Sequence, residues 1–454
     1  MTSLRAGVRV HVIGVGGAGM SAVAIALSEM GAVVSGSDAH DSDVLREVTS
    51  RGVRTFVGHD GAHVGGAEVV LWSPAVGEDN VELNAARGAG ATLLTRAAVL
   101  GELSSLRRVI GLAGTHGKTT ATSMMVHVAL AAGRDDGWLL GAPVSGVGAN
   151  GHWGEGDLIV EVDESYGTFA QIEPYALGLL NVEADHLDHY RSLEGLHSAF
   201  RDLLARTRGP VVAWVDDAGA RAVSEEVGRD VTPVGAGGDA AWRVTNVELE
   251  RRRASFELVG AAETLHVQLR VTGAHNVANA AVVAALASSL EISGDAVERG
   301  LSNFVGAPRR YQYRGAWRGV DVYEDYAHLP GEIDATLAAT RSSGYERITV
   351  VFQPHRVSRT IALVEEFGAA FSLARHVIVT DLYLAGEANP NGVTGEVIAT
   401  ALTRHHPGLD ILYCARLELV VDLLDELSND SDVVLFLGAG DVASVIATLP
   451  GGLA

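Results

Sequence analysis

From residue 8 onward the chain alternates short runs of β-branched residues with longer stretches rich in alanine and leucine. β-Branched runs favour strands, and stretches rich in alanine and leucine favour helices. A regular alternation of the two is typical of parallel sheets covered by helices, because each parallel connection needs a crossover long enough to hold a helix. The sequence therefore predicts an α/β fold.

The length and two changes of pattern divide the chain into three parts. A chain of 454 residues predicts about three domains of ordinary size. The second part contains a more polar, strand-like insertion at Trp242–Val271. We predict domains at 1–107, 108–308 and 309–454. Further strands are expected in the last domain at Ile348–Phe352, His376–Thr380 and Val433–Leu437.

The composition excludes several classes of partner. The 34 lysines and arginines are outnumbered by 56 acidic residues, which gives a formal net charge of −22 and argues against nucleic acid or an anionic membrane as a partner. Cys414 is the only cysteine, so no intramolecular disulfide is possible. No stretch is apolar and long enough for a signal or membrane-spanning helix. We expect a globular, cytoplasmic protein.

Lys118 is the only lysine in the chain, and every other permanent cation is an arginine. A slim ammonium group can lie along a phosphate chain inside a tight loop, whereas a planar guanidinium is too wide for that space. Lys118 follows the apolar run Val109–Ala113 and precedes the helix-like segment Thr119–Ala132. A glycine loop in this setting binds phosphates. The predicted phosphate loop consists of Gly114, Thr115, His116, Gly117, Lys118, Thr119 and Thr120.

This loop is a variant of the common phosphate-loop pattern. The strict spacing requires a glycine five residues before Gly117, and Leu112 occupies that position. The alternative is an ordinary glycine-rich turn in which the lysine is incidental. Because lysine occurs nowhere else in the chain, we favour the phosphate loop.

A second glycine-rich turn lies near the N-terminus. Gly14, Gly16 and Gly19 form a Gly-x-Gly-x-x-Gly pattern after a predicted strand, and Asp38 follows 19 residues after Gly19. This is the complete dinucleotide-binding pattern of a Rossmann-like domain, so a dehydrogenase is one interpretation. The second phosphate loop counts against it, because hydride transfer needs no triphosphate site. The same turn can bind the pyrophosphate of any nucleotide-linked substrate.

Two acidic segments follow predicted strands of the central domain. Glu161 lies in the acidic segment 157–165, and with the Thr119 hydroxyl it could hold a magnesium ion beside the phosphate loop. A solvated strand end is the alternative. The segment 185–189 contains two histidines and two aspartates, which could ligate zinc, although a tight turn rarely directs all four at one ion. A second magnesium ion held by His186 fits better.

Polar residues also cluster at the start of one predicted helix and after later predicted strands. Asn276 and Asn279 lie at the start of an alanine-rich helix, where Asn276 is suited to cap the helix and Asn279 to read a base edge. Three clusters at strand ends combine arginine, histidine and aspartate, as ligand sites of α/β sheets often do. They comprise Arg309-Arg310, Asp325-Tyr326-Ala327-His328 and His355-Arg356 with Arg359.

Over nearly the full chain, these motifs resemble the Mur ligase family in content and order. The matching segments are Gly14–Ser21, Ser35–Asp38, Gly114–Thr120, Glu161–Ser165, Asp185–Tyr190, His275–Asn279, Arg309–Arg310, Asp325–His328, Gln353–Arg356 and Ala385–Glu387.

The resemblance implies three domains and one reaction. A Rossmann-like N-terminal domain would hold a UDP-sugar, a central P-loop-type domain with a parallel sheet would bind ATP and Mg²⁺, and a C-terminal dinucleotide-fold domain would bind an amino acid and close over ATP. The implied activity is the joining of L-alanine to the carboxylate of UDP-N-acetylmuramate through an acyl phosphate, with release of ADP and phosphate. We expect a monomer or homodimer.

The resemblance also implies roles for individual residues. Lys118 would neutralise the β- and γ-phosphates, Thr119 and Glu161 would hold one magnesium ion, and His186 a second. His328 and His355 would be candidate bases for the amine proton. Asn279, Arg310 and Asp325 would contact ATP, Tyr326, His328, His355, Arg356 and Arg359 the amino acid, and Gly14, Gly16, Gly17, Gly19, Met20, Ser37 and Asp38 the UDP-sugar.

The chain departs from the family pattern near the expected substrates. Leu329 stands where a second histidine is usual, Tyr166 stands where aspartate is common, and the loop 149–152 lacks an arginine. These departures leave two other interpretations open. The chain could be a divergent Mur-type ligase that joins another carboxylate and amine, or a homologue that binds nucleotide but has no catalytic activity. The type of relative that uses a carbamylated lysine as a magnesium ligand is excluded, because the chain has no lysine other than Lys118.

Overall fold

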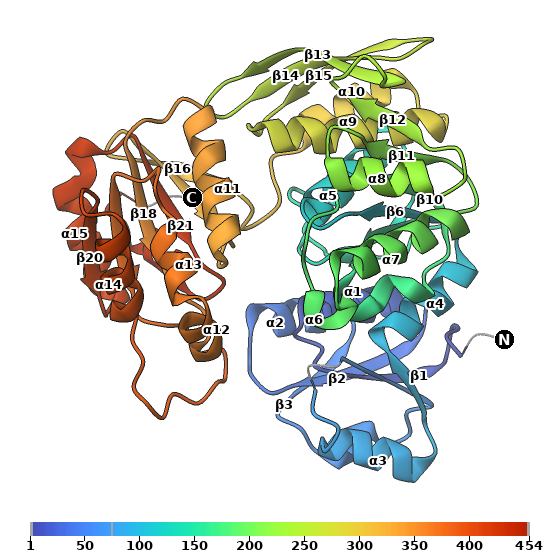
Figure 1. The fold of residues 1–454 in the computed structure, drawn as a ribbon. Coiled ribbons are helices and arrows are strands. Elements are labelled where there is room, and N and C mark those ends of the chain that lie inside the picture. Colours follow the sequence, from blue (N-terminus) through green and yellow to red (C-terminus); the bar gives the residue numbers. More distant parts are fainter. Residues whose placement is uncertain (1–2, 74–75, 452–454) are drawn as a thin grey trace. The chain divides into compact units, whose positions relative to one another are not determined.

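Three β-sheets follow one another along the chain in the computed structural model, which describes residues 3–73 and 76–451 (Figure 1). Most neighbouring strands pair in parallel, and helices flank each sheet. The predicted α/β fold with three domains is therefore confirmed, whereas the proposed boundaries at 107/108 and 308/309 stay predictions. No helix in the described part of the chain is long and apolar enough to cross a membrane.

The N-terminal sheet has the strand order β3-β2-β1-β4-β5, and all its pairings are parallel. This is the Rossmann-like order, in which the connections reverse direction between β1 and β4 and leave a crevice at the carboxyl ends of the strands. The strands are β1 (Arg9–Ile13), β2 (Val33–Asp38), β3 (Arg54–Val57), β4 (Val69–Trp72) and β5 (Thr92–Thr95). The helices are α1 (Ala18–Glu29), α2 (Asp43–Ser50), η1 (Gly61–Val64), α3 (Val81–Ala89) and α4 (Arg96–Leu106).

The central sheet has ten strands in the order β15-β14-β13-β12-β11-β10-β6-β9-β7-β8, with β6 between β10 and β9. Its strands are β6 (Val109–Ala113), β7 (Gly137–Leu139), β8 (Gly151–His152), β9 (Leu158–Val162), β10 (Pro174–Leu179), β11 (Val211–Trp214), β12 (Thr232–Gly235), β13 (Trp242–Leu249), β14 (Ala254–Val259) and β15 (Thr264–Leu269). The last three confirm the predicted strand-like insertion. The helices are α5 (Lys118–Ala131), η2 (Ser165–Gln171), α6 (Leu187–Tyr190), α7 (Leu193–Arg206), α8 (Ala218–Glu226), α9 (Ala274–Ser289) and α10 (Gly294–Asn303).

The C-terminal sheet has the order β16-β17-β21-β18-β19-β20, and only the β16–β17 pairing is antiparallel. Its strands are β16 (Gln312–Trp317), β17 (Val320–Asp325), β18 (Ile348–Phe352), β19 (His376–Thr380), β20 (Asp410–Cys414) and β21 (Val433–Leu437), so the three predicted strands are confirmed. The helices are α11 (Pro330–Ser342), α12 (Val357–Ala362), α13 (Val364–Ala369), α14 (Glu396–His405), η3 (Leu417–Leu419), α15 (Val420–Leu427), η4 (Ser428–Asp430) and η5 (Val442–Thr448).

Both faces of the C-terminal sheet are buried. Val350 belongs to one hydrophobic core cluster with Ile333 of α11, whereas its neighbour Val351 belongs to another with Leu424 of α15. Because successive side chains of a strand point to opposite faces, helices cover the sheet on both sides. This leaves the ends of the strands as the places where polar side chains can gather.

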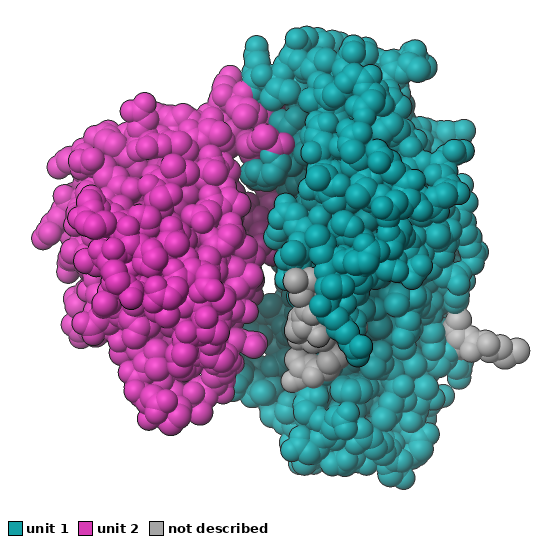
Figure 2. Space-filling model, viewed as in Figure 1, with its two compact units in different colours: residues 1–248, 255–270, 275–305 teal, residues 249–254, 271–274, 306–454 magenta. Residues whose placement is uncertain are grey.

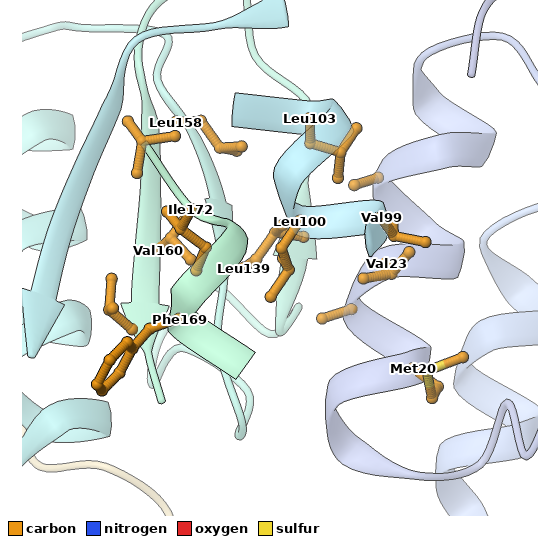
Figure 3. Packing of buried hydrophobic residues seen from close by; sticks show 14 of the residues in the cluster. Met20, Val23, Val99, Leu100, Leu103, Leu139, Leu158, Val160, Phe169 and Ile172 are labelled. Carbon is orange, nitrogen blue, oxygen red and sulfur yellow. The ribbon is translucent and has the colours of Figure 1, made fainter. Parts of the chain in front are cut away.

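Helix α4 joins the first two sheets through one continuous core. Figure 3 shows Val99 of α4 beside Val23 of α1, with Leu103 one turn further along α4 and Leu100 on the side of Leu139 and Ile172. All these side chains are buried. The N-terminal and central sheets therefore fold as neighbours around shared apolar contacts, although each has its own strand order.

The chain forms two compact units, which Figure 2 distinguishes by colour. The first unit contains the N-terminal and central sheets and comprises residues 1–248, 255–270 and 275–305. The second contains the C-terminal sheet and comprises residues 249–254, 271–274 and 306–454. The turn between β13 and β14 thus belongs to the second unit, while most of both strands belongs to the first.

Candidate active site

The predicted phosphate loop lies between β6 and α5. Gly114 has a φ of +145° and Gly117 a φ of +81°, which are backbone angles that favour glycine. Gly117 is the N-cap of α5 and makes no side-chain cap hydrogen bond, so the helix presents its first N–H groups to the loop. A Cβ atom on Gly117 would lie 2.7 Å from Oδ1 of Asn279, which places Asn279 directly against the loop. The geometry suits an anion at this helix start.

Asn181, just after β10, fixes the shape of the loop. The N–H of His116 donates to Oδ1 of Asn181 at 2.7 Å, and Nδ2 of Asn181 donates to the carbonyl of His116 at 3.0 Å. The N–H of Thr115 donates to the carbonyl of Asn181 at 3.1 Å. Asn181 was not among the predicted site residues, and the available signal was an asparagine directly after an apolar strand.

The ammonium group of Lys118 has a full set of acceptors. Its Nζ donates to the carbonyls of Gly114 and Thr115 at 2.9 and 3.0 Å and to Oε2 of Glu164 at 2.8 Å. These contacts use the three donors of an ammonium group. Burial raises the pKa of the Glu164 carboxyl above its ordinary value, although Lys118 favours the charged form. A phosphate in the loop would compete with Glu164 for this cation.

Thr119 and Glu161 form the first predicted magnesium pair. Oγ1 of Thr119 donates to Oε1 of Glu161 at 2.9 Å, and Oε2 of Glu161 accepts the N–H of Gly141 at 2.8 Å. The pair comes from the start of α5 and from β9, which neighbours β6 in the sheet. A hydroxyl and a carboxylate held together beside a phosphate loop are the donors that Mg²⁺ takes in such sites. The residues present therefore fit the ion.

His186 was predicted as the second magnesium ligand, and the structure places Glu164 and Asp185 beside it. Its Nε2 is 4.0 Å from Oε1 of Glu164 and 3.8 Å from Oδ2 of Asp185. One ligand atom from each of the three lies within 4.8 Å of the others. Two carboxylates and an imidazole suit a divalent cation. Glu164 thus contacts both Lys118 and the His186 group.

The N-terminal glycine turn is hydrogen-bonded to the end of β2. Gly14 has a φ of +76°, and its N–H donates to the carbonyl of Ser37 at 2.8 Å. The N–H of Gly16 donates to Oδ2 of Asp38 at 2.9 Å, and a Cβ atom on Gly16 would lie 2.8 Å from that oxygen. Gly17 caps α1 without a side-chain hydrogen bond. The turn therefore presents backbone N–H groups at a helix start, as a pyrophosphate site requires.

The structure buries one residue predicted at this turn and adds another. The Met20 side chain is 3% exposed and lies in the hydrophobic core, because α1 turns it toward the sheet, so its contact with the UDP-sugar stays a prediction that only its backbone could meet here. Arg96 lies beside Gly19, where a Cβ atom would be 2.6 Å from the guanidinium carbon. Nη1 of Arg96 is 3.5 Å from Oδ2 of Asp163. Sequence patterns gave no sign of Arg96.

The paired arginines before β16 have different surroundings. Nε of Arg309 donates to Oε1 of Glu324 at 3.0 Å, and its Nη2 donates to two carbonyls after β21. Arg310 is exposed and stacks over Tyr326, with its guanidinium carbon 5.2 Å from the ring centroid. Arg309 also lies over the Tyr326 ring, with its guanidinium carbon 4.7 Å from the centroid. Arg310 is the more exposed of the pair, and its contact with ATP stays a prediction.

Asp325, at the end of β17, accepts two backbone hydrogen bonds. Oδ2 accepts the N–H of Tyr311 at 2.6 Å, and Oδ1 accepts the N–H of Ala327 at 2.7 Å. Burial raises the pKa of Asp325 to about 6, although these N–H groups and Arg310 favour its charged form. The carboxylate shapes the turn that carries the next two candidate residues, and its predicted contact with ribose stays a prediction.

Two histidines lie close together at the carboxyl end of the C-terminal sheet. The rings of His328 and His355 are 5.7 Å apart between centroids. Nδ1 of His328 is 3.0 Å from the carbonyl of Tyr326, whereas Nδ1 of His355 is 3.3 Å from Nη1 of Arg359. Burial lowers the pKa of His328, and burial together with His328, Arg359 and Arg356 lowers that of His355 to about 4. Both imidazoles are therefore neutral near pH 7.

The structure thus gathers the predicted residues into groups within each unit. The first unit combines a glycine turn at the end of β1 with a lysine loop at the end of β6 and carboxylates after β9. The second combines arginines, tyrosine and two histidines at strand ends. These features define a nucleotide-binding α/β protein with a phosphate loop and Mg²⁺-type ligands.

Comparison with known proteins places the chain within this class. Family models match residues 9–108 (Mur ligase family, catalytic domain), 154–287 (Mur ligase middle domain) and 309–440 (Mur ligase, glutamate ligase domain). The chain belongs to the Mur ligase family.

Similar proteins match almost the whole chain. The UDP-N-acetylmuramate–L-alanine ligase of Thermobifida fusca is 39% identical over 451 residues, which cover 96% of this chain and 95% of that protein. The protein of the same name from Paenarthrobacter aurescens is 40% identical, with 96% and 95% covered. The solved structure of the UDP-N-acetylmuramate–alanine ligase MurC from Thermotoga maritima matches with a TM-score of 0.81 and 28% identity, covering 96% of this chain and 97% of that one.

Proposed function

We propose that this chain is an ATP-dependent ligase that joins L-alanine to the carboxylate of UDP-N-acetylmuramate and releases ADP and phosphate. The likeness to ligases with this named activity, at 39–40% identity over nearly their whole length, carries the proposal. The phosphate loop, the carboxylates beside it and the glycine turn of the N-terminal sheet supply the binding groups that such a reaction needs.

In the first step, a carboxylate oxygen of the sugar attacks the γ-phosphorus of ATP, and ADP leaves. The product is an acyl phosphate. Lys118 lies along the phosphate chain and offsets its charge, after it exchanges Glu164 for phosphate oxygens. Bound Mg²⁺, held by Thr119 with Glu161 and by the His186 group, would neutralise the charge between the two anions.

In the second step, the amine of L-alanine attacks the acyl carbon. A C–N bond forms, phosphate leaves with the electrons of the C–O bond, and the amine gives up a proton. His328 fits the proton acceptor better than His355. Its Nδ1–H donates to the Tyr326 carbonyl, which leaves a lone pair on Nε2. Nδ1 of His355 instead accepts from Arg359, so Nε2 of His355 carries the hydrogen.

The amino acid has suitable cations close to these histidines. Arg356 is exposed at the start of α12, and Arg359 lies one turn further along. Burial, and then Arg356, lowers the pKa of Arg359, so an anion between the two guanidiniums would relieve their repulsion. We assign the carboxylate of L-alanine to this pair, because arginine binds carboxylates in a bidentate way.

Within the described residues, the departures from the family pattern give no sign of another substrate. The backbone N–H at position 329, which histidine would supply as well as leucine, donates to Glu332 at 3.1 Å at the start of α11. In the loop 149–152, the buried Asn150 donates to the carbonyl of Ala18 at 2.8 Å and so ties this loop to α1. The side chain of Tyr166 lies outside the described residues. No observation favours the divergent ligase, so we propose one function.

The test is phosphate release from Mg-ATP with UDP-N-acetylmuramate, with and without L-alanine, against other amino acids. We expect release that depends on both substrates, and ATP turnover only with other partners would contradict the proposal. Chelation of Mg²⁺ should stop release, and added Mg²⁺ should restore it. Turnover that survives chelation would overturn the assignment of Glu161 and His186 as magnesium ligands. Because nucleotide substrates are made inside the cell, we expect a cytoplasmic protein, and its state as a monomer or homodimer stays a prediction.

A further inference from the structure

A buried carboxylate, Glu82 of α3, lies beneath the proposed UDP-sugar site. Its side chain is 0% exposed. One oxygen accepts from Nδ1 of His59 at 3.0 Å and from the Ser37 hydroxyl, and the other accepts from Nδ1 of His63 at 2.9 Å. Buried carboxylates that lack donors are rare, because desolvation disfavours the charge. Here the charge has three side-chain donors from three different segments.

Burial alone would raise the pKa of Glu82, but the nearby His11, whose Nε2 is 3.7 Å from the carboxylate, and the hydrogen bonds from Ser37, His63 and His59 lower it to about 2. The carboxylate is therefore ionised at neutral pH and can only accept hydrogen bonds. Nδ1 of His59 must then carry a hydrogen, and so must Nδ1 of His63. In the neutral ring, the second nitrogen, Nε2, is left as an acceptor.

The position of these rings relates them to the proposed ligand. Ser37 lies one residue before the end of β2, beside the glycine turn, and His59 follows the next strand, β3. In a Rossmann-like sheet, the phosphates lie at the turn after the first strand, and the nucleoside extends past the end of the second. The base of a bound UDP-sugar would thus lie toward His59. The side chains of His59 and His63 are 25% and 20% exposed, and the edge of each ring opposite Nδ1 faces away from Glu82.

We propose that Glu82 is a positioning residue for the uracil base, because it fixes the tautomer of His59 and the rotation of the Ser37 hydroxyl. Nε2 of His59 then accepts from N3–H of uracil. Cytosine has no hydrogen on N3 and presents a lone pair there, so the same nitrogen repels it. This inference rests on the proposed function, since it assumes a uridine nucleotide at the glycine turn.

The experiment is calorimetric binding of UDP and CDP to the full chain and to the variants Glu82→Gln, His59→Ala and the double variant. We expect the unchanged chain to prefer UDP, and each single variant to bind UDP about tenfold more weakly with that preference lost. The double variant should bind no more weakly than the weaker single variant, because both changes remove one interaction.

Ligase kinetics separate positioning from a merely structural role. Glu82→Gln should raise KM for UDP-N-acetylmuramate by about tenfold and leave kcat and KM for ATP within about twofold. The matched control is Glu102→Gln, whose carboxylate likewise accepts a serine hydroxyl, Ser3 at 2.9 Å, elsewhere in the N-terminal domain. This control should leave UDP affinity unchanged.

Several outcomes would overturn the inference. They are equal affinity of the unchanged chain for UDP and CDP, no UDP binding at all, an unchanged preference in Glu82→Gln, or equal increases in KM for both nucleotides. If Glu82→Gln does not fold, His59→Ala decides, and a kept UDP preference in that variant refutes the role of His59. If UDP binds selectively but no phosphate is released with alanine, the proposed function fails and this inference stands.

Discussion

At the scale of single residues, the phosphate loop requires the shape of the Lys118 ammonium group as well as its charge. Its three acceptors lie at 2.8–3.0 Å, two of them backbone carbonyls of the loop itself. A guanidinium places its nitrogens in a rigid plane and cannot direct three donors from one point. This geometry agrees with the presence of one lysine among 34 basic residues.

Lys118→Arg should therefore remove activity without unfolding the chain. We expect phosphate release to fall by at least about a hundredfold, because the phosphate chain loses its cation in the correct place. Thermal unfolding should shift little. The matched control is Arg108→Lys, whose guanidinium binds Asp157 at 2.8 Å at the other end of β6. Retention of a tenth of the activity in Lys118→Arg would contradict the requirement for lysine at this position.

The pH dependence of kcat should reflect His328. Burial lowers the pKa of its imidazole below the ordinary 6.5, so the neutral form persists to lower pH than in a free histidine. The acid limb of kcat should thus have its midpoint below pH 6.5, and His328→Gln should abolish this limb together with most of the rate. His355→Gln should mainly raise KM for L-alanine. A limb that persists in His328→Gln would identify another base.

The role of a residue could be predicted from the sequence where its position requires one kind of side chain. Lys118 and the glycines beside it were found because a phosphate loop needs them in that order. Glu164 and Arg96 were not singled out as site residues, because their roles come from partners 46 and 67 residues away in the chain, Lys118 and Asp163. The burial of the Met20 side chain could not be predicted, because a methionine in a motif gives no sign of which face of α1 it occupies.

At the scale of elements, α4 connects two sheets through opposite sides of one short helix. Leu103 lies fully buried in the shared core, while Leu106 is 39% exposed three residues later. The alanines and leucines of α4 favour a helix, but they cannot identify the two surfaces that the helix joins, since both partners are simply apolar. The order of the strands likewise depends on contacts between distant segments.

Leu103→Ala should lower the free energy of unfolding of the first unit by about 3 kcal/mol, because it leaves a cavity that the core cannot fill. Leu106→Ala on the same helix should cost less than about 1 kcal/mol. Urea unfolding followed by tryptophan fluorescence measures both. Equal effects of the two variants would show that Leu103 of α4 does not stabilise the core shared by the two sheets.

Glu82 links α3 to the loops after β2 and β3, and its contribution should depend on pH. Its folded-state pKa of about 2 lies below the ordinary 4.5, so its stabilisation is fully present above pH 4.5 and is lost as the pH falls toward 2. Glu82→Gln should therefore cost about 2 kcal/mol near pH 7 and almost nothing near pH 2. Urea titrations at several pH values test this, and a pH-independent difference would contradict it.

At the scale of the whole molecule, two compact units predict two unfolding transitions. A ligand stabilises only the unit that binds it. UDP should thus raise the transition temperature of the first unit, which carries the glycine turn, and leave the second unchanged. Scanning calorimetry measures this, and Leu103→Ala identifies the first transition by lowering it alone. A shift confined to the other transition would place UDP in the second unit.

The division of the chain between the units also limits how this protein can be cut and recombined. Arg251, from the turn between β13 and β14, stacks over Tyr345, and its carbonyl accepts from Tyr323 at 3.1 Å. Tyr323 lies on β17 and Tyr345 just before β18, yet the turn is encoded about 60 residues before β16, where that sheet begins. A gene fragment for residues 306–454 would therefore omit part of its own fold. Exchange of C-terminal domains between relatives must carry two separate stretches of coding sequence to keep this contact.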